Sequence, residues 1–179
     1  MSALMAGLQK LLLSTEQIEK RVDELARQIS SDYANTTLHV VCVLENAFVF
    51  MADLVRKLSI PVACSFVRPV MREKEGTETP TTEIFFGPQP NVSGEHVLLV
   101  EGLVQSGQTT DFLIRTFSAS GAASVKVCTL LDKQSDRTIS LQPDYFGFIV
   151  HEQFVMGYGL GDPRLGRNLP YITSRAGGE

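Results

Sequence analysis

A buried strand that runs directly into a glycine-containing turn and a helix is the most constraining feature of this chain. Residues 96–100 read His-Val-Leu-Leu-Val, which is too uniformly apolar for a strand with one face in water. A loop over 101–108 follows, and helical spacing of apolar residues resumes over 109–118. A strand, loop and helix in this order are typical of a parallel α/β sheet.

The same alternation of apolar strands and amphipathic helices extends along most of the chain. The apolar runs predict strands over 39–43, 62–66, 82–86, 96–100, 124–131 and 145–150, and helical spacing predicts helices over 15–29, from Asn46 onward and over 109–118. We therefore expect an α/β fold with a central parallel sheet, flanking helices and right-handed crossovers. A length of 179 residues favours one domain, 1–179, with a sizeable core.

Composition excludes several classes of function and location. The net charge of −4 gives no reason to expect nucleic-acid binding or an anionic membrane surface as a partner. No stretch approaches the roughly 20 apolar residues needed to span a bilayer. Cys42, Cys64 and Cys128 lie in apolar runs without a CxxC spacing, which favours reduced core thiols over a disulfide framework. We expect a cytoplasmic protein.

The loop that follows the central strand has the features of an anion site. In open parallel sheets, ligands bind beyond the carboxyl ends of the strands. Gly107 lets the backbone approach an anion, the first N–H groups of the next helix are unpaired, and the hydroxyls of Ser106, Thr109 and Thr110 add donors. The loop 101–110 therefore predicts a phosphate site, although an ordinary β–α turn has a similar composition.

Residues 69–81 are polar and rich in turn-forming residues. This composition predicts a long mobile loop. A lid over a binding site and a surface excursion without function both fit the composition, and it does not separate them.

Several segments resemble one known family in the same order along the chain. Residues 97–110, VLLVEGLVQSGQTT, resemble the ribose-phosphate loop V-E-D-I-I-D-T-G-x-T of the type I phosphoribosyltransferases. Further matching segments are VLENAFVFMADL at 43–54, PVACSFVR at 61–68, VKVCTLLDK at 125–133, PDYFGF at 143–148, FVMGYGL at 154–160 and RNLPYI at 167–172. Over roughly residues 37–172 the chain resembles the hypoxanthine-guanine phosphoribosyltransferase family.

This resemblance implies a function and an organisation. Enzymes of the family are glycosyltransferases of purine salvage that join a 6-oxopurine to phosphoribosyl pyrophosphate, with Mg²⁺, and release pyrophosphate and a purine nucleoside monophosphate such as GMP or IMP. They are homodimers or homotetramers. The resemblance also implies an N-terminal helical segment at 1–36, a mobile lid loop at 69–81 and a purine-binding hood at 151–172.

The resemblance assigns roles to individual residues. The 5′-phosphate would be held by Ser106, Gly107, Gln108, Thr109 and Thr110, the purine by Lys133, Phe154 and Val155, and pyrophosphate by Arg68 and Arg167. Lys133 would donate to the purine 6-oxygen, Phe154 would stack on the base, and the backbone of Val155 would contact the purine edge. The alternatives are surface charges for Lys133 and Arg68 and a core position for Phe154.

The catalytic loop departs from the family pattern. The acidic pair after the strand is Glu101-Gly102, so only Glu101 could contact the ribose diol or a metal-bound ligand. The aspartate considered the general acid/base is replaced by Gln105, whose amide cannot take up a proton at neutral pH. Loss of positioned proton transfer costs on the order of 10²–10⁴ in rate.

The pyrophosphate and metal parts depart as well. The family's Leu-Lys-Gly, whose unusual peptide helps bind pyrophosphate, is Leu44-Glu45-Asn46 here, so an anion replaces a cation where a polyanion should bind. The Ser-Tyr pair of the lid is Met71-Arg72, and Gly161 replaces an aspartate that helps place Mg²⁺. Metal binding is therefore in question.

Two functions are the main interpretations of this pattern, and a third is a structural subunit that pairs with an active paralogue. The chain is either a purine phosphoribosyltransferase with weak or altered activity, or a non-catalytic module that senses or sequesters GMP or IMP. Both keep a pocket shaped for a purine nucleoside monophosphate, because the departures fall on the pyrophosphate, metal and proton-transfer parts.

Overall fold

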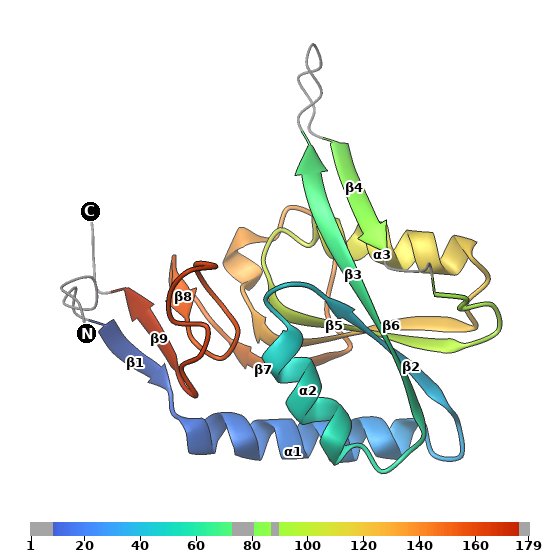
Figure 1. Cartoon of the computed structure of the whole chain (residues 1–179), viewed down its shortest axis with the longest axis horizontal. Coiled ribbons are helices and arrows are strands. Elements are labelled where there is room, and N and C mark those ends of the chain that lie inside the picture. Colours follow the sequence, from blue (N-terminus) through green and yellow to red (C-terminus); the bar gives the residue numbers. More distant parts are fainter. Residues whose placement is uncertain (1–8, 73–80, 87–89, 176–179) are drawn as a thin grey trace.

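The computed structural model describes residues 9–72, 81–86 and 90–175 of the chain (Figure 1). Its helices and strands are β1 Gln9–Leu13, α1 Thr15–Asp32, β2 Leu38–Val43, α2 Phe48–Lys57, β3 Val62–Arg72, β4 Thr81–Phe86, β5 His96–Val104, α3 Gln108–Ala119, β6 Ser124–Asp132, β7 Tyr145–Ile149, β8 Val155–Met156 and β9 Ile172–Arg175, with a 3-10 turn at Gln134–Asp136. In the described part of the chain, no helix is long and apolar enough to cross a membrane.

The larger sheet has six strands in the order β4-β3-β2-β5-β6-β7. Five of them, β2, β3, β5, β6 and β7, pair in parallel, which confirms the predicted parallel α/β sheet. Strand β4 pairs antiparallel with β3, with Arg68 opposite Phe85. The chain crosses over between the parallel strands through α2 and α3, whereas β3 and β4 are consecutive and need no crossover.

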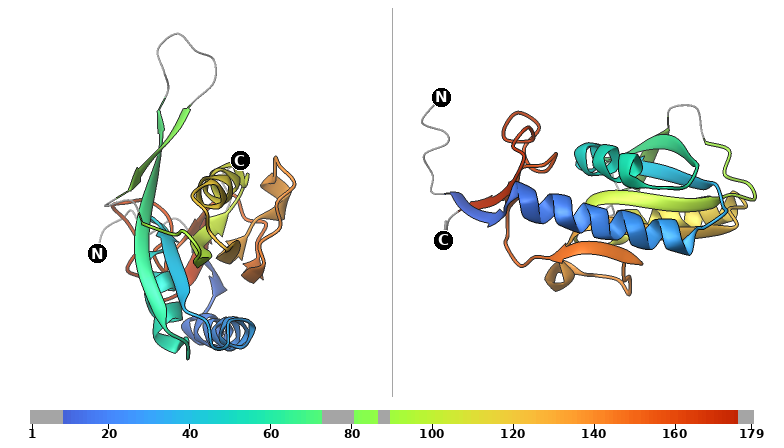
Figure 2. Two further views of the ribbon diagram at one scale, coloured as in Figure 1. Left: turned by 90° about the vertical axis from the view of Figure 1, so that its right-hand side faces the viewer. Right: turned by 90° about the horizontal axis from the view of Figure 1, so that it is seen from below.

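Helices cover both faces of this sheet (Figure 2). Helices α1 and α2 pack on one face, where Leu25, Phe50 and Leu98 are fully buried. Helix α3 packs on the other face through Leu113 and Phe117. A capping box of Ser14 and Gln17 starts α1, with both reciprocal hydrogen bonds present.

A second, three-stranded sheet with the order β1-β9-β8 lies beside the larger one, at the left of Figure 1. It contains the strands of the predicted hood. Within the predicted N-terminal helical segment 1–36, residues Gln9–Leu13 form a strand instead, which pairs antiparallel with β9, with Leu11 opposite Thr173. The apolar run at 11–13 is too short to distinguish a helix from a strand, so pairing with a segment 160 residues later decides its structure.

Several predicted boundaries differ from the observed ones. Helix α2 begins at Phe48 rather than Asn46, and Ala47 at its start makes no side-chain cap. The predicted loop 69–81 is strand at both of its ends, because β3 runs to Arg72 and β4 begins at Thr81. Residues 73–80, which hold most of the predicted lid, lie outside the described residues.

The cysteines are only in part the expected core thiols. Cys42 and Cys128 are buried, and burial raises the pKa of the Cys42 thiol to about 12 and that of Cys128 further. Cys64 is exposed, so the prediction of a core position was wrong for this residue. Cys64 lies on β3, against which no helix packs extensively in the described part of the chain.

Candidate functional site

Three residues that the sequence analysis singled out lie at the carboxyl ends of the parallel strands. Glu45 follows the end of β2, Gln105 follows the end of β5, and Lys133 follows the end of β6. The backbone N–H of Lys133 donates to the carbonyl of Val104 at 2.9 Å, so the last two of these ends are held together. This edge of the sheet is where ligands bind in open α/β folds.

The anion loop is shorter than the sequence predicts. Strand β5 continues through Glu101 to Val104, paired with β6, so the turn consists of Gln105–Gly107 and α3 begins at Gln108. Gly107 has φ 83°, which only glycine adopts readily, and turns the chain into the helix without a side-chain cap. The N–H of Gln108 donates to Oγ of Ser106 at 3.4 Å, and the N–H groups that follow it in the first turn of α3 point toward the space where an anion could bind.

The hydroxyl of Thr110 does not point toward the phosphate site predicted at the start of α3. Its hydroxyl donates to Oε1 of Glu101 at 2.6 Å, and both residues are buried. Burial raises the pKa of the Glu101 carboxyl to about 7, against the opposing effects of the Thr110 hydrogen bond and of Arg137. The hydroxyl of Thr110 is therefore directed to Glu101 rather than toward the predicted phosphate site, and Glu101 is a buried carboxyl beneath α3.

Lys133 is buried rather than a surface charge. Its side chain is 6% exposed, and its ammonium lies 2.7 Å from Oδ2 of Asp136 in the following 3-10 turn. The hydrogen bond from Lys133 lowers the pKa of Asp136. A buried ammonium held in place by a neighbouring carboxylate is a fixed hydrogen-bond donor, as recognition of a carbonyl group requires.

A cavity of about 270 Å³ lies between the anion loop and the hood. The residues that line it are Asn46, Leu103, Gln105, Gln153, Phe154, Val155, Leu160, Gly161 and Asp162. Phe154 is 44% exposed, which excludes the core position considered from the sequence, whereas Val155 is buried. An exposed aromatic ring at the wall of a cavity can stack on a planar base.

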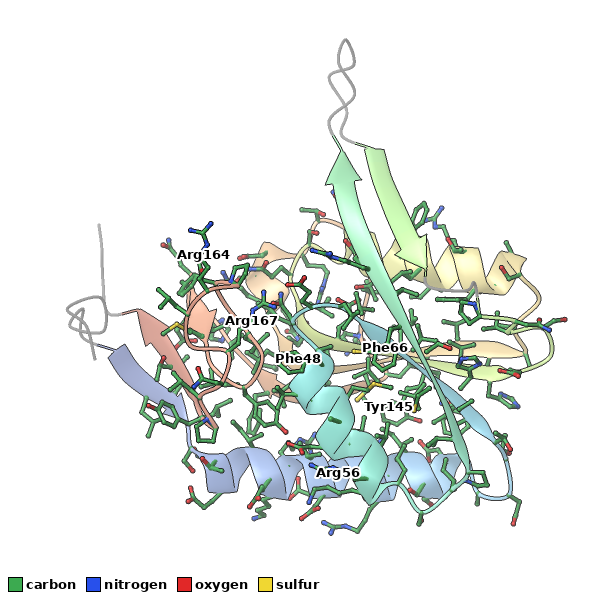
Figure 3. All side chains as sticks on the ribbon, viewed as in Figure 1. Phe48, Arg56, Phe66, Tyr145, Arg164 and Arg167 are labelled. Carbon is green, nitrogen blue, oxygen red and sulfur yellow. The ribbon has the colours of Figure 1, made fainter. Side chains whose placement is uncertain are left out.

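Arg68 and Arg167 come together although they lie 99 positions apart in the chain. Nη2 of Arg68 is 3.0 Å from Oε1 of Glu45, and Nη1 of Arg167 is 3.0 Å from Oε2 of the same carboxylate. Figure 3 shows Arg167 on the hood loop near the first residue of α2, Phe48. The two arginines predicted to bind pyrophosphate are thus both paired with a carboxylate of the chain itself.

Comparison with known proteins agrees with this arrangement. The model of the phosphoribosyl transferase domain family matches residues 9–162. The hypoxanthine-guanine phosphoribosyltransferase of Bacillus subtilis is 34% identical over 165 residues, which is 92% of each chain, and that of Streptococcus pneumoniae is 33% identical over the same shares. This chain belongs to the hypoxanthine-guanine phosphoribosyltransferase family.

Solved structures of the family share the fold. A hypoxanthine-guanine phosphoribosyltransferase from Bacillus anthracis is 34% identical with a TM-score of 0.84, over 92% of this chain and 96% of that one. A hypoxanthine phosphoribosyltransferase from Staphylococcus aureus is 28% identical with a TM-score of 0.89, over 97% of this chain and 95% of that one. The expected phosphoribosyltransferase fold is therefore confirmed.

Gly102, which replaces a family aspartate, is tightly packed on the opposite face of β5 from Glu101. A Cβ at this position would overlap the backbone carbonyl oxygen of Asn46 and lie 2.9 Å from Cδ2 of Leu160. The β2–α2 connection therefore occupies the space that any side chain at position 102 would need. The absence of a carboxylate at position 102 and the altered Glu45-Asn46 turn therefore go together, because Asn46 packs where a side chain at position 102 would lie.

The residues present do not fit a protein-held Mg²⁺ ion. The described residues contain no group of three or more His, Cys, Asp or Glu side chains that could hold a metal. Glu101 is buried and bonded to Thr110, and Gly102 and Gly161 carry no side-chain oxygen. Asp162 is exposed, and its Oδ1 accepts a hydrogen bond from the backbone N–H of Arg164 at 2.7 Å.

Arg137 is a site residue that the sequence did not reveal. Its Nη1 donates to the backbone carbonyl of Gln105 at 2.7 Å, and its Nη2 pairs with the buried carboxylate of Asp132. Next to it, the N–H of Thr138 donates to the carbonyl of Ser106 at 3.2 Å. Arg137 thus fixes the anion loop from outside. Arg137 lies in a polar segment of the sequence, and in such a segment the sequence does not distinguish an arginine with a structural role from an exposed one.

Proposed function

We propose that this chain binds a purine nucleoside monophosphate, GMP or IMP, and that its phosphoribosyl transfer is impaired. The position of Gln105 carries the proposal. It starts the turn that leads into α3, and it also lines the cavity together with Phe154 and Val155. A phosphate at the start of α3 and a base against Phe154 would therefore belong to one ligand.

The purine side of the pocket supports a 6-oxopurine as the base. The exposed ring of Phe154 lines the cavity and offers a stacking surface. Lys133 is not among the residues that line the cavity, and it offers a buried donor for a carbonyl oxygen from the end of β6. The hood supplies backbone groups at Val155 for the edge of the base. These are the residues that the family resemblance assigns to purine recognition.

The residues at the family's catalytic positions support a slow phosphoribosyl transfer. Gln105 cannot act as a general base, which costs on the order of 10²–10⁴ in rate. Gly102 supplies no carboxylate, and Glu101 is buried under α3 with its hydrogen bond directed to Thr110. The groups that would move a proton or hold the ribose diol are therefore absent from the cavity wall or turned away from it.

We expect GMP and IMP to raise the melting temperature, whereas phosphoribosyl pyrophosphate should raise it little. A ligand at 100 times its dissociation constant stabilises the folded state by about 2.7 kcal/mol. Phe154→Ala should weaken GMP binding about tenfold or more, because stacking contributes about 1–3 kcal/mol per base. Thermal shift measurements test this, with Phe112→Ala as the control, because Phe112 is a similarly exposed phenylalanine on α3.

The proposal fails if neither nucleotide changes the melting temperature at millimolar concentration. It also fails if Phe112→Ala weakens binding as much as Phe154→Ala. In that case the exposed aromatic ring at the cavity would have no special part in binding.

A slow enzyme and a non-catalytic sensor are distinguished by the residue at position 105. Gln105 is exposed, so an aspartate fits there. For an enzyme, Gln105→Asp should raise the rate of hypoxanthine or guanine conversion about tenfold or more, because it restores a group that can accept a proton. The assay compares it with Gln153→Asp, which places a carboxylate elsewhere in the same cavity. Absence of conversion in both variants, with GMP still bound, favours the sensor.

The remaining expectations belong to the same proposal. They are a homodimer or homotetramer, a cytoplasmic role in purine salvage, and no nucleic-acid or membrane partner. Exposed Phe48 and Phe66 supply apolar surface of the kind that subunit interfaces bury.

A further inference from the structure

Three segments that are distant in the sequence meet at the carboxylate of Glu45. Glu45 lies in the connection after β2, Arg68 lies on β3, and Arg167 lies in the hood loop before β9. Each carboxylate oxygen holds one guanidinium group, both at 3.0 Å. The carboxylate therefore bridges two arginines that come from separate parts of the fold.

The two guanidinium groups form a built anion site. Arg167 is 19% exposed, and its Nε and Nη2 donate to the carbonyl of Gly161 at 3.3 and 3.1 Å, which fixes the orientation of its guanidinium. Planar guanidinium groups match the oxygens of carboxylates and phosphates equally well. The pair is thus an oxyanion site whose occupant is Glu45.

This anion site adjoins the nucleotide cavity. Asn46, the residue after Glu45, lines the cavity, and so does Gly161, which holds Arg167. A ligand with one phosphate at the start of α3 and further phosphate groups at the two arginines would therefore lie across the same pocket.

We propose that Glu45 closes a latent pyrophosphate-type oxyanion site formed by Arg68 and Arg167. This inference rests on the proposed monophosphate binding and adds the reason for its selectivity. An external polyanion must either displace Glu45 or bind beside it, and at these separations like charges repel strongly. Because Glu45 is part of the chain, its local concentration at the arginines is high. The pocket therefore accepts a monophosphate and rejects a ligand with a pyrophosphate group.

The ion pair between Glu45 and Arg68 contributes little to the free energy of unfolding, because both side chains are exposed. The side chains of Glu45 and Arg68 are 41% and 61% exposed, and ion pairs this open to water contribute little to folding. Glu45→Gln is therefore expected to stay folded, and its effect on ligand binding can be measured directly.

The test is titration calorimetry of inorganic pyrophosphate into the wild-type chain and into Glu45→Gln. The variant should bind pyrophosphate about tenfold or more tightly than wild type, because the repelling charge is gone. Glu45→Ser should show the same gain, so the result does not depend on one variant. The control is Glu24→Gln, which removes a glutamate that also pairs with an arginine, Arg21, but lies on α1. It should leave pyrophosphate binding unchanged.

Two results would overturn the inference. One is equal pyrophosphate affinity in wild type and in both position-45 variants. The other is a gain that survives in Glu45→Gln/Arg68→Gln, because the new binding would then not involve Arg68. GMP thermal shifts on the same samples keep the two proposals separate. A missing GMP shift refutes the proposed function, whereas the pyrophosphate comparison alone decides the role of Glu45.

Discussion

Replacing Gly102 by alanine is expected to lower the free energy of unfolding by about 3 kcal/mol, the upper end of the usual cost of overpacking. The added methyl group would overlap the carbonyl oxygen of Asn46, which is backbone and cannot rotate away as a side chain would. Leu160 blocks a second direction at 2.9 Å. Urea denaturation measures the change, with an unchanged m value as evidence that only stability has shifted.

Gly94→Ala is the matched control. Gly94 has φ 76° and nothing within 4 Å of an added Cβ, so alanine there meets backbone strain without a steric overlap. The cost of the left-handed conformation should be about 1–2 kcal/mol. If Gly102→Ala were no more destabilising than Gly94→Ala, the conclusion that the carbonyl of Asn46 packs closely against Gly102 would be wrong.

This packing affects how a reversion to the family pattern should be tested. An aspartate at position 102 needs the same space as alanine and more, so Gly102→Asp alone would lose stability before it could contribute to catalysis. The loss of the second carboxylate is thus tied to the course of the β2–α2 connection. Gln105→Asp has no such obstacle, because Gln105 is exposed.

The second large effect concerns Glu101 and pH. Burial raises the pKa of this carboxyl from 4.5 to about 7 in the folded protein. Below pH 4.5 the group is protonated in both the folded and the unfolded state. Between pH 4.5 and 7 the folded state binds more protons than the unfolded state, so the free energy of unfolding falls as the pH rises. Above pH 7 the full loss, about 3 kcal/mol, is present.

Glu101→Gln should remove this dependence. The amide oxygen can still accept the hydrogen bond from Thr110, but the side chain no longer ionises. The unfolding free energy of the variant minus that of wild type should therefore rise by about 3 kcal/mol between pH 4 and pH 8. Chemical denaturation across this range measures it. Subtracting the wild-type value removes the contributions of all other groups.

A difference that does not change with pH for Glu101→Gln would show that its carboxyl is not desolvated in the folded protein. The expected sign matters too. A difference that falls with rising pH would mean that Thr110 and Arg137 stabilise the carboxylate more than burial penalises it.

Much of the fold could be predicted from local pattern. Uniformly apolar runs such as 96–100 and 124–131 are strands, because only a central parallel strand buries both of its faces. The Gly107 turn and the start of α3 were also found, since glycine at a strand–helix junction has a recognisable local signature. The antiparallel pairing of β4 and the strand β1 were missed, because both depend on partners rather than on their own residues.

The candidate site divides in the same way. The residue types that bind a phosphate and a purine, with Gly102, Gln105 and Glu45 as departures, are visible in the sequence because motifs are contiguous. Which of these residues face the cavity is not. The sequence predicts Thr110 as a phosphate ligand, whereas its hydroxyl donates to Glu101. No sequence motif marks Arg137, whose guanidinium donates to the backbone carbonyl of Gln105.

By itself, then, the sequence determined the family, the order along the chain of the helices and of the strands of the larger sheet, and the absence of acidic residues at positions 102 and 105. Only the tertiary structure decided that Glu45 holds Arg68 and Arg167, and that the carbonyl of Asn46 fills the space beside Gly102. The physical reason is distance along the chain. Hydrophobic periodicity and turn chemistry are read within a few residues, whereas these contacts join residues 23 to 122 positions apart and exist only when the strands and the hood are assembled.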